Sequence, residues 1–355
     1  MVFSKLQLIN SGIMTPKNIY KRLALLPIVS LFLLVGCVND DLSVCGLKLH
    51  FKYTRNMANT DRFKEEITKV NLYIFDSVEG TLVDEYTVEQ NPMPEDFTIY
   101  LNLEPGLYDF VAWGDLKNSY SLTFPAVKGV TTRTELEVQL NRSDSAITNL
   151  PTNLYYGSIE QYQVASHDLL IQKDTVISMI KDTKEITVVA HGLAIIGSNR
   201  TAGTAYDCHI SALDGNLSFK NYTISDDLIQ YIPNADVEED SILVSRFAIV
   251  RNHDIIRDDE GRPRSPQSRV RVNRIDSDGT SQRSLLDMDL YPILVAAANM
   301  DPLVVAGGGD LPVDIKDKYQ IDIFFDETYG TASIFIGDWE YRWTDQPVGG
   351  DYNWK

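Results

Sequence analysis

Residues 47–53 read Leu-Lys-Leu-His-Phe-Lys-Tyr, so apolar and polar side chains alternate along this stretch. Successive side chains of a β-strand point to opposite faces, and this period of two therefore predicts a strand with a buried apolar face and with His50 on its outer face. The following stretches repeat the pattern and are separated by turn-forming residues such as Pro105-Gly106. Short strands at this spacing predict a β-sandwich, built first from residues 47–53, 70–75, 81–88, 97–103, 107–113 and 136–140.

The second half of the chain has the same character. Asp214-Gly215 and Asp278-Gly279 are typical of hairpin turns, and the first is expected to join the two strands that flank it. The strands expected in this half lie at residues 175–180, 184–190, 205–213, 216–224, 241–250, 269–275, 319–325 and 332–336.

Helical periodicity is scarce. One short helix is expected within residues 61–69, with Thr60 or Asp61 as its N-cap, and another within residues 285–298, where Pro292 should interrupt it. The fold is therefore expected to be all-β. The chain is long enough for two domains of about 150 residues each. We place the boundary within the polar residues 161–174, which gives an N-terminal β-sandwich domain over 46–165 and a C-terminal β-sandwich domain over 166–355.

A lipoprotein signal precedes the strands. Basic residues between positions 17 and 22 are followed by the apolar run 23–35, which ends in Leu34-Val35-Gly36-Cys37. The run is shorter than the roughly 20 apolar residues that span a bilayer, and its flanks are typical of a secretory signal peptide. A small residue before cysteine is the pattern read in lipoprotein processing. We therefore predict that residues 1–36 are removed and that Cys37 carries the lipid; Met14 is a candidate for the true start.

Residues 37–45 would then tether the first strand to the membrane. Within them, Asn39-Asp40-Asp41 resembles the surface-export signal of lipoproteins in the bacteria that build type V pili. The alternative is an acidic, flexible tether without a sorting role. The export reading predicts a lipid-anchored outer-membrane protein that faces outward from the cell.

The chain is strongly acidic, with a formal net charge of −18, which argues against a nucleic-acid partner because such proteins present basic surfaces. The hydrolase elbow, the His-Glu-x-x-His motif and the phosphate loop are absent from the sequence, and the five histidines are scattered. Asp276-x-Asp278-Gly279 lacks the later glutamate of a calcium loop. We therefore expect neither an enzyme nor a cofactor or metal site.

Several residues are candidates for modification or pairing. Cys45 and Cys208 remain beside Cys37 and could form a disulfide in an oxidising envelope, which the sequence alone leaves open. Four Asp-[Ser/Thr]-apolar triplets resemble the O-glycosylation site of envelope proteins in the same group of bacteria. Their candidate acceptors are Ser77, Ser145, Thr175 and Ser241.

Residues 257–283 are locally basic and include the alternating Arg269 and Arg271. They could dock an acidic partner subunit or a glycan. We favour an exposed hairpin, since charged outer faces are the norm there, and we expect Asp258, Asp259 and Glu260 to balance its charge.

The order of the motifs resembles the fimbrial anchor lipoproteins of type V pili, the fimbrillin-A-associated anchor proteins. The similarity is carried by Cys37, Cys45-Gly46, the strand 47–53 with Thr54-Arg55-Asn56 behind it, Asp61-x-Phe63, Val70–Asp76, Tyr108–Gly114, and Trp339 after Ile334–Gly337. The resemblance implies two tandem transthyretin-like β-sandwich domains, anchoring in the outer membrane, and control of pilus attachment and length.

The same resemblance draws attention to Arg55. In stalk subunits similar to this family, a protease cuts after an arginine that follows the first strand, and a neighbour's strand then fills the groove. Arg55 occupies that position here. The alternative, which we favour, is a solvated arginine before a turn, because an anchor must keep the strand that links it to its lipid.

We therefore expect a surface lipoprotein that is an anchor or accessory subunit of a fimbria, with fimbrillins as partners. The alternative is a surface glycan-binding lipoprotein or a fimbrial tip adhesin with host or microbial surface ligands. For that alternative the candidate contact residues are Trp339, Tyr341, Trp343 and Trp354.

Overall fold

The computed structural model of the chain describes residues 46–165, 172–193, 205–224, 228–233, 237–239, 242–250, 268–275, 282–306, 312–326, 332–337 and 339–341. Residues 46–355 form one compact unit. The predictions for the signal peptide, Cys37, the Asn39-Asp40-Asp41 run and Cys45 concern residues outside the described part. Strands dominate the described residues, and the expected all-β class is confirmed.

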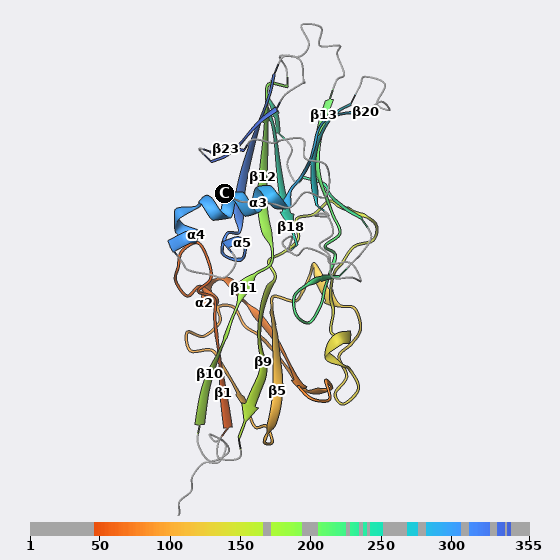
Figure 1. The fold of residues 1–355 in the computed structure, drawn as a ribbon. Helices are drawn as coiled ribbons and strands as arrows, with labels where there is room; N and C mark the ends of the chain where they lie inside the picture. The colour runs from red at the N-terminus through yellow and green to blue at the C-terminus, as the bar shows by residue number, and fades with distance from the viewer. Residues whose placement is uncertain are drawn as a thin grey trace, which may run out of the picture. The chain divides into compact units, whose positions relative to one another are not determined.

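The first predicted strand is the middle strand of a three-stranded sheet. β1 (Gly46–Lys52) pairs in parallel with β10 (Gln172–Ser178) and antiparallel with β4 (Thr98–Leu101). β1 and β10 run side by side in Figure 1. As the alternation predicts, Leu47, Leu49 and Phe51 are buried on one face.

A five-stranded sheet packs against this small sheet. Its order is β11-β9-β5-β2-β3. β2 is apolar on both faces because each face meets a different core: Val70, Leu72 and Ile74 pack with the β1 sheet, whereas Tyr73 and Phe75 pack with the rest of the molecule. Its strands are β2 (Lys69–Asp76), β3 (Leu82–Glu89), β5 (Gly106–Gly114), β9 (Tyr155–Val164) and β11 (Ile180–Lys181).

Three further sheets surround the second core. A six-stranded sheet has the order β17-β18-β12-β21-β22-β23, a five-stranded sheet β20-β19-β13-β16-β8, and a four-stranded sheet β15-β14-β7-β6. The bounds of these strands are β6 (Tyr120–Leu122), β7 (Val138–Leu140), β8 (Ala146–Ile147), β12 (Lys184–His191), β13 (Ala205–Ala212), β14 (Asn216–Leu217), β15 (Thr223–Ile224), β16 (Ile229–Tyr231), β17 (Val237–Glu239), β18 (Ile242–Ile249), β19 (Arg269–Ile275), β20 (Gln282–Asp289), β21 (Lys318–Phe325), β22 (Ala332–Ile336) and β23 (Trp339–Tyr341).

Strand pairing crosses the predicted domain boundary in both directions. β7 and β8, from the first half, pair with β14 and β16, whereas β10, from the second half, pairs with β1. The polar residues 161–174 also contribute to two strands, since β9 ends at Val164 and β10 begins at Gln172. The division at residue 165 and the transthyretin-like detail stay predictions.

The two helix predictions have different outcomes. α2 (Phe63–Glu66) lies inside the expected 61–69, but its N-cap residue is Arg62, so the expected cap at Thr60 or Asp61 is wrong, although Asp61 Oδ1 accepts a hydrogen bond from the Phe63 N–H. The helix expected over 285–298 is wrong in its first part, because residues 282–289 form β20. α3 (Tyr291–Met300) then begins with Pro292 in its first turn, where a missing N–H costs nothing. The other helices among the described residues are α4 (Pro302–Ala306), α5 (Pro312–Ile315) and the 3₁₀ helix η2 (Arg133–Glu135).

The hairpin expected at Asp214-Gly215 is wrong. β13 pairs with β16 and β19, whereas β14 pairs with β7 and β15, so the chain changes sheets at this turn. The hairpin after β19 is confirmed by its pairing with β20, although Asp278-Gly279 itself lies outside the described residues.

Candidate functional site

β1 is held on both edges and on one face. Leu49 lies opposite Ile99 in β4 and opposite Thr175 in β10. The Phe51 ring lies 5.5 Å from the Phe97 ring, between centroids. Because the strand is bonded to both neighbours and its apolar face is buried, it is an integral part of the first core.

The segment that follows β1, residues 53–62, is closed by its own hydrogen bonds. The Tyr53 N–H donates to Asp61 Oδ1 at 3.0 Å, and the Arg62 N–H donates to the Tyr53 carbonyl at 2.9 Å. Asn56 is buried inside the loop, and its Nδ2 donates to the carbonyls of Tyr53 at 2.7 Å and Thr60 at 2.8 Å. We call this segment the post-β1 loop.

Arg55 fastens the post-β1 loop to the C-terminal helices. Its guanidinium lies 3.3 Å from the carboxylate of Asp314 in α5, and the Asp314 side chain is only 7% exposed. Asn59 Nδ2 donates to the Leu303 carbonyl of α4 at 3.3 Å. The turn expected after Arg55 is present, and the Arg55 side chain is 34% exposed, so it is partly solvated as well as paired with Asp314.

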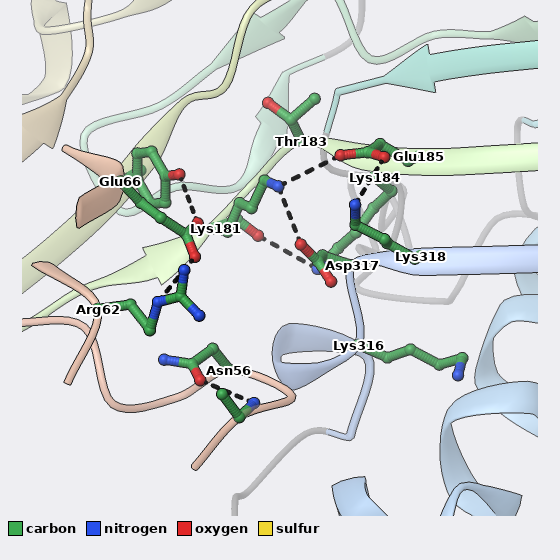
Figure 2. A network of polar contacts seen from close by, with 12 residues as sticks. Asn56, Arg62, Glu66, Lys181, Thr183, Lys184, Glu185, Lys316, Asp317 and Lys318 are labelled. Atoms are coloured by element: carbon green, nitrogen blue, oxygen red, sulfur yellow. Dashed lines mark hydrogen bonds and ion pairs between the residues drawn. The ribbon is translucent and has the colours of Figure 1, made fainter. Parts of the chain in front are cut away.

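A second polar cluster, the junction network, consists of Lys181, Lys184, Glu185, Asp317 and Lys318 (Figure 2). Lys181 Nζ lies 2.9 Å from Asp317 and 3.7 Å from Glu185, and Lys318 Nζ lies 3.2 Å from Glu185. Lys184 Nζ donates to the Lys181 carbonyl at 3.2 Å. The hydrogen bond from Lys318 to Glu185 raises the pKa of that lysine. Burying the Lys181 ammonium group is costly unless it is paired, so the network fixes β11 to the start of β21.

Figure 2 places Arg62 and Glu66 of the first half beside this network. Arg62 Nε lies 3.6 Å from Glu66, whose other carboxylate oxygen accepts the hydroxyl of Tyr155 at 3.0 Å. Burial, followed by the negative charge of Glu66, raises the pKa of Tyr155, so its hydroxyl stays protonated and donates. The post-β1 loop therefore joins the two halves through polar contacts, whereas the junction network ties β11 to the start of β21.

A buried carboxylate that the sequence did not single out is Asp109 of β5. It accepts close hydrogen bonds from the Ser77 hydroxyl and the Arg133 guanidinium, and a third at 2.8 Å from the Gln161 N–H. Gln161 has a positive φ and forms a bulge in β9 opposite Asp109. A bulge interrupts the alternation of apolar and polar residues, so the sequence pattern predicts neither β9 nor the hydrogen bond from Gln161 to Asp109.

This arrangement bears on the candidate glycosylation sites. The Ser77 hydroxyl is engaged by Asp109, whereas Ser145 is exposed and Thr175 is half-exposed on β10. Ser241 lies outside the described residues. All four assignments stay predictions, as does the pairing of Cys45 with Cys208, which is buried in β13.

Two arginines in the described part of the basic hairpin are paired with aspartates. Arg269 Nη1 lies 2.7 Å from Asp289, and Arg271 Nε lies 3.1 Å from Asp287. Both aspartates are on the neighbouring strand β20. Burial works against ionisation of Asp287, but hydrogen bonds from Arg269 and Arg271 outweigh it and lower its pKa. The expected partners Asp258, Asp259 and Glu260 lie outside the described residues.

Histidines and acidic groups do not converge within the described ranges. His50 lies 3.7 Å from Asp174, His191 lies 3.0 Å from Asp322, and His209 lies 3.2 Å from Asp207. The described residues contain no group of three or more side chains with metal-ligand geometry. Trp343 and Trp354 lie outside them. In the same part of the chain, no helix has the length and apolarity needed to cross a membrane.

Both the sequence and the fold are similar to those of known proteins. Residues 42–345 match the family model of the fimbrillin-A associated anchor proteins Mfa1 and Mfa2. The fimbrial anchor protein Mfa2 from Porphyromonas gingivalis has a similar structure, with a TM-score of 0.63 at 18% identity over 83% of this chain and 98% of that one.

Two further solved structures have the same fold. A candidate adhesin from Bacteroides ovatus has a TM-score of 0.65 at 19% identity over 87% of this chain and 98% of that one. A candidate polysaccharide-binding protein from Bacteroides thetaiotaomicron has a TM-score of 0.62 at 22% identity over 85% and 99%. A search of curated proteins found no match.

The family match covers most of the chain, and the structural similarity extends over nearly all of the P. gingivalis anchor protein. The family consists of structural fimbrial anchor proteins. The chain therefore belongs to the fimbrillin-A associated anchor proteins and is a fimbria-associated protein of the bacterial cell surface.

Proposed function

We propose that this protein anchors a surface fimbria to the outer membrane through lipid on Cys37, and that β1 is not removed by proteolysis. Its direct partners are then fimbrial subunits. The observation that carries the proposal is the fastened post-β1 loop, in which Arg55 pairs with Asp314 and Asn56 is buried. A protease needs an extended segment, and this loop is instead folded back on itself by its own hydrogen bonds.

The energetics of β1 support the same role. Burying side chains such as Leu47, Leu49, Phe51 and Tyr53 contributes about 1.5–3 kcal/mol each. Losing the strand without replacement would therefore approach the whole stability of a domain, typically about 5–15 kcal/mol. An anchor has no upstream subunit to supply a replacement, so retention of β1 is the arrangement that keeps it folded.

Mass spectrometry of the protein isolated from the cell surface tests this proposal. The expected mature form begins at a lipidated Cys37 and contains Gly46–Lys52. A form that begins at Asn56 would identify a stalk subunit instead. Cys37→Ala is the matched control, since it removes the lipid acceptor but leaves the described fold untouched.

Deleting the gene tests the role in attachment and length. Without an anchor, fimbriae are expected to be shed into the medium or to grow abnormally long, because nothing holds or stops the fibre. Normal retention and normal length would refute the anchor role and favour the glycan-binding or tip-adhesin alternative, which a glycan array on the purified protein can then examine.

A further inference from the structure

Gly46, which directly follows the expected tether of residues 37–45, marks one end of the N-terminal sheets. Gly46, the first residue of β1, lies opposite Gln172, and Leu47 lies opposite Leu101. The turn between β2 and β3 is at this same end, because the Ser77 N–H donates to the Leu107 carbonyl near the start of β5 at 2.9 Å. We call it the tether end.

The loop over residues 127–132 is bonded to that turn. The Leu82 N–H donates to the Thr131 carbonyl, the Gly129 N–H donates to the Leu82 carbonyl, and the Arg133 N–H donates to the Gly80 carbonyl, each at 2.8 Å. Two segments far apart in sequence thus form one surface at the tether end.

This surface presents three apolar side chains to solvent. Val78 is 82% exposed, Val130 is 69% exposed and Val127 is 48% exposed. We call them the valine tip. Turn apices usually carry glycine, asparagine, aspartate or serine, so three exposed valines on two hydrogen-bonded loops are a departure from ordinary turn chemistry.

The valines are held in place by rigid turns. Asp76 Oδ1 accepts the N–H groups of Val78 at 2.7 Å and Glu79 at 2.8 Å. The Val127 N–H donates to Thr131 Oγ1 at 2.8 Å, and the Thr131 N–H donates to the Val127 carbonyl at 2.9 Å. Because these bonds fix the backbone that carries the valines, little backbone freedom is lost when the tip meets a partner.

We infer that the valine tip rests in the surface of the lipid bilayer to which the protein is tethered. This inference rests on the proposed lipid at Cys37. Residues 37–45 reach at most about 30 Å when fully extended, so the tether end can never move far from the membrane. Three valines bury too little apolar surface to bind a membrane from solution, but a tether raises their effective concentration at the bilayer enough for a weak contact to form.

The charges around the valine tip indicate which lipid surface suits it. Lys128, between Val127 and Val130, is 68% exposed at its side chain, and its ammonium group lies 3.6 Å from Asp84, so its positive charge is balanced there. Glu79 beside Val78 is exposed and is repelled by an anionic headgroup layer. The valine tip therefore fits a zwitterionic surface better than an anionic one.

The test uses the mature lipidated protein in phosphatidylcholine vesicles, with and without bromine on the acyl chains. Val78→Trp places a reporter at the tip, and Val176→Trp on the outer face of β10 is the matched control. The emission added by Val78→Trp should shift to the blue and lose most of its intensity in brominated vesicles. The emission added by Val176→Trp should be the same in both.

Equal quenching at the two positions in protein that floats with the vesicles would overturn the inference and leave the lipid anchor intact. Protein that does not float with the vesicles would overturn the anchor and the inference together. Anionic phosphatidylglycerol vesicles should give weaker quenching of Val78→Trp, and stronger quenching there would contradict the charge argument.

Discussion

Asp109 shows how one buried carboxylate can organise three separate segments. Its pKa is lowered: burial opposes ionisation, but the hydrogen bonds from Ser77, the Gln161 N–H and Arg133 outweigh that effect. Asp109→Asn keeps the shape and removes the charge. We expect it to lower the free energy of unfolding near neutral pH by about 1.5–3 kcal/mol, the typical worth of hydrogen bonds to a charged group.

The pH dependence of this effect has a defined sign. A group with a depressed folded-state pKa stabilises the protein above its ordinary pKa of 3.8 and loses that contribution as the pH falls through the lower folded value. The difference between wild type and Asp109→Asn in urea unfolding should therefore shrink on acidification. Asp84→Asn, which breaks an exposed pair with Lys128, is the control and should cost about 0–1 kcal/mol.

The closed form of the post-β1 loop depends on the side chain of Asn56. Asn56→Ala removes the hydrogen bonds that close the post-β1 loop, including the one that its Oδ1 accepts from the Ala58 N–H at 3.0 Å. Each such bond contributes about 0.5–1.5 kcal/mol net, so a total loss of about 2–3 kcal/mol is expected. Trypsin should also cut after Arg55 faster than in wild type. The exposed Asn102→Ala should change neither, and an unchanged cleavage rate in Asn56→Ala would mean that the loop is not protected by this side chain.

The strand β1 is the element on which the anchor role depends, and its first residue tests how tightly it is fitted. Gly46 has a φ of 127°, and a Cβ there would lie 2.5 Å from the Leu101 carbonyl oxygen of β4. Gly129 has a φ of 73° with open space around it. Gly129→Ala should therefore cost only the backbone strain, about 1–2 kcal/mol, whereas Gly46→Ala adds a clash and should cost more.

Hydrogen exchange of the β1 amides distinguishes these two variants. Gly46→Ala should speed exchange along Leu47–Lys52 by separating β1 from β4, and Gly129→Ala should leave it unchanged. Equal exchange in both would show that the start of β1 can shift without loosening the strand.

The sequence identified elements well where one face is buried and the ladder is regular. The predicted 269–275 and 332–336 coincide with β19 and β22, and 47–53 overlaps β1. β9 is not predicted by the sequence pattern because Gly157 and the bulge at Gln161 interrupt its alternation of apolar and polar residues. The adjacent Leu285 and Leu286 break the period of two, so the pattern predicts a helix for residues 285–289 of β20.

The connections between the two halves were not predictable from local pattern. Arg55 and Asp314 are separated by 259 positions, far more than a turn or a helical repeat can relate. The alternation of apolar residues predicted the fold class and the resemblance to anchor proteins added the expected role, but neither could place Asp109, Asp314 or the junction network, since each depends on which side chains tertiary packing brings together.

The junction network predicts how the whole molecule unfolds. Asp317→Ala leaves the Lys181 ammonium buried without its 2.9 Å partner, and breaking a buried pair typically costs about 3–5 kcal/mol. Calorimetry should show a broader or split unfolding transition compared with the wild type, because the five-stranded sheet that contains β11 loses its tie to the six-stranded sheet that contains β21. Adding Lys181→Met should restore most of the stability, and a double variant no better than Asp317→Ala would show that the pair is not coupled.

The place of β1 has a mechanical consequence. In an anchored fibre, the lipid would hold the chain at Gly46 while drag acts on the half beyond the junction network. The load would then run along the axis of β1, which is bonded to β10 over Gly46–Lys52 on one edge and to β4 on the other. A pull in this direction shears the ladder as one block instead of unzipping it bond by bond, so rupture would require many hydrogen bonds to fail together. Resistance to drag would then be set by the slow rate of forced unfolding, and not by equilibrium stability.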